Sequence, residues 1–60
     1  MITVTYFYPT ADGYKEGSKE FHDSKKALEF MYTMKKKGFK NFEWITEDPE
    51  DNEYLYRRFY

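Results

Sequence analysis

The first nine residues alternate between the two faces of an extended chain. One face holds Ile2, Val4, Tyr6 and Tyr8, and the other holds Thr3, Thr5 and Phe7. All of these residues are β-branched or aromatic, and a period of two in such residues predicts a strand over 2–9. Turn-forming residues, among them Asp12-Gly13, occupy positions 10–17. The polar segment 18–22 then predicts a second strand, joined to the first as a hairpin.

Helical periodicity replaces this alternation in residues 25–37, which contain neither Gly nor Pro. At about 100° per residue, one arc of the helix collects the apolar side chains: Ala27, Leu28, Phe30, Met31 and Met34. Asp23 or Ser24 is placed to cap the start, and Gly38 to end the helix with a positive φ. The pattern predicts an amphipathic helix over about 24–37 and a third strand over 41–46.

The C-terminal segment fits two structures. Asp48 and Pro49 form a helix start, with an N-cap residue followed by proline in the first turn. The aromatic residues that follow also have high strand propensity, so a fourth strand, giving ββαββ, is the alternative. We favour a helix over about 49–59, because its start signal is specific and because Arg57 and Arg58 interrupt any strand alternation.

These elements predict one small α+β domain spanning residues 1–60. The first strand is the most apolar and should be central, with its hairpin partner on one side and the third strand on the other. The expected fold is a two-layer ββαβ arrangement, with a three-stranded antiparallel sheet of order 2-1-3 and the amphipathic helix on one face. We expect the C-terminal segment to fold back over the opposite face, packing by Leu55 and Phe59 against the sheet or the helix edge.

Composition limits how such a domain is stabilised. The chain has 60 residues, no cysteine and one histidine, so disulfides and a Cys/His zinc site are excluded. A chain of this length buries only about 60% of the surface that its unfolded form exposes. Aromatic residues make up 23% of the sequence, and their large rings are one way to fill a small core.

Charge narrows the classes of partner. Charged residues make up 35% of the chain, yet the net charge is only −1. A dedicated nucleic-acid-binding domain is usually strongly basic, so nucleic acid is not the favoured partner. No apolar run is long enough to span a membrane, and no signal-like segment opens the chain. We therefore expect a cytoplasmic protein, and the lysine-rich usage is typical of a bacterial or phage genome.

No catalytic, cofactor-binding or metal-binding set stands out. The run His22-Asp23-Ser24 contains the residue types of a hydrolytic triad, but adjacent residues cannot converge in triad geometry. The acidic residues between positions 47 and 53 lack the spacing and the glycine of a calcium-binding EF-hand loop. A strand end, a helix cap and a solvated turn account for these residues, so we expect no enzyme and no cofactor.

The aromatic content exceeds structural need and indicates a partner-binding surface. The candidate residues are of the types that dominate binding hot spots: Phe7, Trp44, Tyr54, Tyr56, Arg57, Arg58 and Tyr60. Phe7 lies on the sheet face away from the helix, and the third strand adds either Phe42 and Trp44, or Ile45, to that face. If the C-terminal segment leaves this face uncovered, the face is an interaction surface.

A basic and aromatic cluster supports an alternative. Charge combined with stacking rings can bind single-stranded nucleic acid, and the candidates are Lys35, Lys36, Lys37, Lys40 and Phe39. The favourable helix dipole at a C-terminus already explains most of these lysines.

The sequence therefore favours a small non-enzymatic protein-interaction module, such as a phage- or mobile-element-encoded modulator of a host protein. A nucleic-acid-binding domain is the alternative, and a purely structural or homodimeric small protein is the third possibility. The expected partner is a protein, with no membrane involved, and the chain itself is expected to be a monomer or a weak homodimer.

Overall fold

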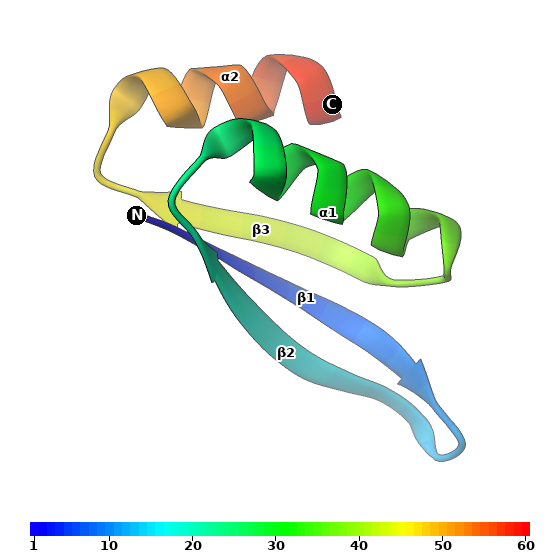
Figure 1. Cartoon of the computed structure of the whole chain (residues 1–60). Helices are drawn as coiled ribbons and strands as arrows, with labels where there is room; N and C mark the ends of the chain where they lie inside the picture. Colours follow the sequence, from blue (N-terminus) through cyan, green and yellow to red (C-terminus); the bar gives the residue numbers. More distant parts are fainter.

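The computed structural model describes residues 1–60 and shows the expected α+β arrangement (Figure 1). Its elements are β1 (Ile2–Thr10), β2 (Gly13–Phe21), α1 (Ser24–Lys36), β3 (Lys40–Thr46) and α2 (Pro49–Phe59). The sheet order is β2-β1-β3 and both pairings are antiparallel, as predicted. The C-terminal segment is a helix, so the alternative of a fourth strand is wrong.

The hairpin is longer than the sequence pattern predicted. The second strand begins at Gly13 and not at Ser18, so most of the expected turn region is strand. A tight turn makes this possible, because the Thr10 hydroxyl donates to the Gly13 carbonyl at 2.6 Å and accepts from the Asp12 N–H at 3.3 Å. Pairing with the apolar β1 holds this polar segment extended despite its low strand propensity. The hairpin end therefore projects beyond the helices (Figure 1).

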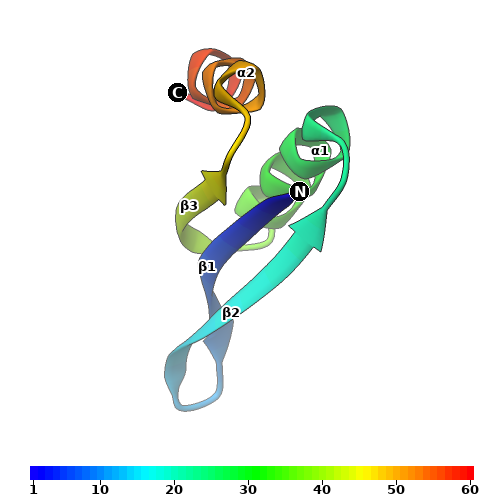
Figure 2. The same cartoon turned by 90° about the vertical axis from the view of Figure 1, so that its left-hand side faces the viewer.

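Both helices lie on the same face of the sheet (Figures 1 and 2). Helix α1 packs on β1 and β2, whereas α2 packs on β3 and against α1. The expectation that the C-terminal segment covers the opposite face is therefore wrong. The helix-side face offers α2 a continuous cluster of buried aromatic and aliphatic side chains, whereas the other face is mostly threonine, serine and glutamate with a few separate apolar residues, so apolar burial favours the position beside α1.

Six side chains form the fully buried core. They are Ile2, Val4, Ala27, Met31, Phe42 and Leu55. Two strands, β1 and β3, and both helices contribute. Helix α2 supplies Leu55, which is 0% exposed. Phe59 packs against this core from the next turn of α2. The predicted packing of the C-terminal segment through Leu55 and Phe59 is confirmed.

Half-buried rings extend the core along the sheet. The Tyr6 ring lies 5.4 Å from that of Phe30 and 5.3 Å from that of Phe39, measured between ring centroids. Gly17 lies directly opposite Tyr6 on β2, and a Cβ added there would be 2.8 Å from Tyr6 Cε1. The Tyr6 ring therefore occupies space that is free only because residue 17 has no side chain.

Phe59 joins the second helix to the same ring system. Its centroid lies 5.4 Å from Phe42 and 6.1 Å from Trp44, both in edge-on geometry. The Tyr32 ring of α1 is 5.6 Å away on the other side, and the Tyr32 hydroxyl donates to the Arg58 carbonyl. The last turn of α2 is therefore held by both β3 and α1.

The predicted helix ends are confirmed. Asp23 caps α1, since its side chain accepts from the Lys25 N–H at 2.8 Å, and Asp48 caps α2 by accepting from the Glu50 N–H at 2.9 Å. At the C-terminus of α1, Gly38 has a φ of 97°. The amides of Gly38 and Phe39 donate to carbonyls in the last turn, at 3.2 and 3.1 Å, which is a Schellman motif.

The first prediction concerns Gly38. A valine there must adopt a left-handed backbone conformation, which costs about 1–2 kcal/mol. Gly38→Val should therefore lower the thermal midpoint clearly, as followed by circular dichroism. Gly38→Asn is the matched control and should lose less, because asparagine enters this conformation more readily. The nearest atom to an added Cβ is 3.7 Å away, so steric clash contributes little. Equal melting curves for the two variants and the parent would contradict the predicted strain.

The second prediction concerns the last helix. Leu55→Ala removes a fully buried side chain, and should cost about 2–5 kcal/mol in a denaturant titration. The neighbouring Tyr56 is 64% exposed, and Tyr56→Ala should change stability by no more than about 0.5 kcal/mol. Truncation after Asp48 should leave the chain unfolded or aggregated. A truncated chain that stays folded and monomeric would show that α2 is dispensable for the core.

Candidate functional site

The uncovered side of the sheet, here called the open face, is defined by the strand register. It comprises Thr3, Thr5, Phe7 and Pro9 of β1, Tyr14, Glu16, Ser18 and Glu20 of β2, and Lys40, Glu43 and Ile45 of β3. Directly paired residues share a face of an antiparallel sheet. The sequence left two alternatives for β3. The register shows that Ile45 is on the same face of the sheet as Phe7, whereas Phe42 and Trp44 are on the face covered by the helices.

Apolar side chains are exposed on the open face. Ile45 is 72% exposed and Tyr14 is 49% exposed, and Phe7 is half-buried between its strand neighbours. Single exposed apolar residues are normal on protein surfaces. Here three of them share one face that no other element covers, and such a face is typical of a contact surface.

The charges of the open face are unbalanced. It carries the carboxylates of Glu16, Glu20 and Glu43 against the single ammonium group of Lys40. None of the three glutamates takes part in an ion pair, since the one ion pair of the molecule lies within α2. The Lys40 ammonium lies 4.7 Å from the centre of the Tyr14 ring. The open face is therefore acidic, although the whole chain is close to neutral.

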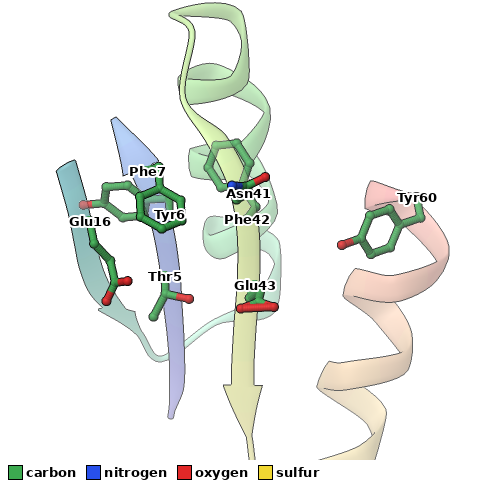
Figure 3. Close-up of a pocket in the computed structure, with 8 residues that line it drawn as sticks. All are labelled: Thr5, Tyr6, Phe7, Glu16, Asn41, Phe42, Glu43 and Tyr60. Carbon is green, nitrogen blue, oxygen red and sulfur yellow. The ribbon is translucent and has the colours of Figure 1, made fainter. Parts of the chain in front are cut away.

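A hollow of about 460 Å³ lies in the middle of the open face (Figure 3). Glu16 and Glu43 stand on either side of Thr5, and Phe7 and Asn41 line the hollow next to them. The sheet is irregular here, because the pairing of β1 with β3 shifts register between Thr5 and Phe7. Asn41 has a φ of 54° at this bulge. Asparagine tolerates a positive φ better than most residues, and its presence at position 41 is the only signal of the bulge in the sequence.

The predicted partner-binding residues do not form one surface. Phe7 lies on the open face, whereas Trp44 lies on the helix-covered face, where its indole N–H donates to Asn52 Oδ1 at 2.9 Å. Tyr60 is 76% exposed and its ring centroid lies 5.7 Å from that of Trp44. Tyr60 also lines the hollow from beyond the edge of β3 (Figure 3).

The remaining predicted residues lie along α2. The Arg58 guanidinium lies 4.2 Å from the centre of the half-buried Tyr54 ring. Arg57 pairs with Glu53 at 2.7 Å, in the spacing of one helical turn. Tyr56 is 64% exposed, and its ring lies 5.6 Å from that of Tyr60. Local contacts within the helix therefore occupy both arginines.

The basic and aromatic residues considered for nucleic acid lie around the junction of α1 and β3. Phe39 is half-buried, with its ring 5.3 Å from Tyr6 and 5.9 Å from Tyr8, so its face is already occupied. The Lys35 ammonium lies 5.3 Å from the Phe59 ring at the end of α1, where Lys36 and Lys37 also lie. Lys40, by contrast, is on the open face. Lys35, Phe39 and Lys40 nevertheless line the same hollow, of about 410 Å³, so nucleic-acid binding stays an untested alternative.

Two further observations describe the molecule as a whole. No three His, Cys, Asp or Glu side chains are grouped closely enough to hold a metal ion. Neither helix has the length and apolarity that crossing a membrane requires.

The sequence matches no protein-family model, no curated protein and no solved structure.

The third prediction concerns nucleic acid. The lysines at the junction of α1 and β3 should bind RNA or DNA no more tightly than about 10 µM at physiological salt, in the range of non-specific binding, with affinity falling steeply as salt rises. A fluorescence anisotropy titration at two salt concentrations measures both quantities. Sub-micromolar binding that is lost in the double variant Lys36→Glu and Lys40→Glu would contradict this expectation.

Proposed function

We propose that the protein is a small interaction module that binds another protein through the open face and performs no catalysis. The observation that carries the proposal is the exposure of Ile45 and Tyr14, which lie toward opposite ends of β1 with Phe7 between them, on a sheet face that both helices leave uncovered. Burying such apolar surface is the main driving force of protein association. In this proposal, the module occupies a surface of a larger protein, as a phage- or mobile-element-encoded modulator of a host protein would.

The dimensions of the open face indicate an interface with few anchors. The nine residues of β1 span about 30 Å, and three strands are about 10 Å wide. This projected area, about 300 Å², is well below the roughly 800 Å² that each partner buries in a standard interface, and such small contacts are typical of transient binding. Affinity would then depend on a few side chains, and the apolar candidates are Phe7, in the middle of the face, and Ile45, opposite Thr3 near the start of β1.

The groups around the central hollow also favour binding over chemistry. The hollow combines carboxylates with a hydroxyl, an amide and aromatic rings, and it contains no pairing of a nucleophile with a base. The single histidine, His22, is exposed where β2 ends, in the connection to α1, and does not line the hollow. Side chains of this kind provide contacts and hydrogen bonds to a partner surface.

The fourth prediction tests the open face by site-specific photo-crosslinking in an extract of the native host. A photoreactive residue replaces Ser18, which lies on the open face and is exposed. A matched control carries it at Glu29, which is exposed on α1. We expect a discrete adduct from position 18 that unlabelled protein competes away, and none from position 29.

A second variant tests whether the exposed apolar side chains of the open face are needed for binding. Ile45→Glu should abolish the adduct from position 18 and leave the fold intact, because Ile45 is 72% exposed; circular dichroism checks the fold. Proposed binding through the open face is wrong if no adduct forms, if the adduct arises only from position 29, or if Ile45→Glu leaves it unchanged.

A further inference from the structure

We infer that the partner presents a basic amphipathic helix, which lies along β1 on the open face. Its apolar residues would contact Phe7 and Ile45, and its lysine or arginine side chains would reach the glutamates on both sides. This inference rests on the proposed function and names the chemistry of the partner.

The arrangement of charge on the open face is the first support. Glu16 and Glu20 lie on β2, on one side of the central strand, and Glu43 lies on β3, on the other side. Between them, β1 contributes only Thr3, Thr5, Phe7 and Pro9. The face thus has an uncharged centre, two unpaired carboxylates on the β2 margin, and the Glu43 carboxylate together with the Lys40 ammonium on the β3 margin. Interfaces commonly have an apolar centre and a polar rim, and charge complementarity assigns cations to the partner's rim.

The width of the face is the second support. Neighbouring strands are about 4.8 Å apart, so β2 and β3 are separated by about 10 Å. An α-helix with its side chains is about 10–12 Å across. A helix centred on β1 would therefore place residues flanking its apolar stripe above both glutamate margins. It would also give the sheet a helical layer on each face, which is a common way to cover a sheet.

The hollow between Glu16 and Glu43 is the third support. The volume of this hollow is about 460 Å³, and Phe7 lines it together with Glu16 and Glu43. A long cationic side chain can place its stem against a ring and its charge near carboxylates. Lys40 already makes a contact of this type with Tyr14 on the same face.

A second copy of the chain does not fit this face. In a two-fold dimer each subunit presents the same surface, so two surfaces that each carry three glutamates and one lysine, and hence a net negative charge, would face each other. Like charges that lie directly opposite destabilise an interface. Helix α1 of another copy carries exposed lysines, but its apolar stripe, with Ala27 and Met31, is buried in its own core. The occupant is therefore a different protein.

The fifth prediction uses designed peptides and the full chain labelled with ¹⁵N. One helical peptide carries a leucine stripe flanked by arginine on both sides, and a second carries glutamate in place of arginine. A third has the composition of the first in an order that no longer separates apolar from basic residues. We expect the first to bind at least about 10-fold more tightly than the others, with amide shifts in the strands, and to weaken as salt screens the charges.

Two variants locate the charge contribution. The double variant Glu16→Gln and Glu43→Gln should weaken binding of the arginine peptide by about 10-fold, since it removes one carboxylate from each margin. Glu29→Gln alters the same kind of group on the exposed side of α1 and should leave binding unchanged. Equal binding of the arginine and glutamate peptides, shifts confined to α1 and α2, or no binding at all would overturn the inference.

The outcome also separates this inference from the proposed function. The crosslinked adduct from position 18 is measured in the Glu16→Gln and Glu43→Gln variant alongside Ile45→Glu. If the adduct is lost only with Ile45→Glu, the open face binds a partner without the carboxylates, so the proposed function stands and the basic helix is wrong. Loss of the adduct in both variants supports the two proposals together.

Discussion

The architecture depends on how few side chains the chain can bury completely. Six residues are buried, and one of them, Leu55, comes from the last helix. A chain of this size hides only about 60% of its unfolded surface, so no apolar stripe can be left outside the core. Helix α2 is therefore needed beside α1, where Phe59 meets Phe42 and Trp44. The open face is the consequence, because both helices lie on the other side of the sheet.

Local signals in the sequence were sufficient for most of the fold. The alternation in β1, the Asp48-Pro49 start and Gly38 each determine their structure through neighbouring residues, and the structure confirms all three. The extension of β2 was missed because pairing with β1, and not its own propensity, holds residues 13–17 extended. The side on which α2 packs was also missed, since it depends on how apolar the two sheet faces are relative to each other.

The candidate site was only partly predictable for the same reason. Phe7 follows from strand alternation alone, and Ile45 was one of two alternatives. Glu16 was expected in a turn, so its place in an acidic margin could not be anticipated, and Glu43 acquires its role only through the register with Thr5. The bulge at Asn41 depends on how β1 and β3 pair, and a single asparagine in the sequence is not enough to predict it.

The position of Leu55 also has a consequence for how the protein is made. The core joins Ile2 in the first strand to Leu55 in the last helix, so the earliest and latest elements must meet before either is stable. Domains usually fold as units during synthesis. On the ribosome, this chain would stay without its native core until residue 55 has left the exit tunnel. Any holding of the nascent chain by a chaperone would therefore act on nearly the whole domain at once.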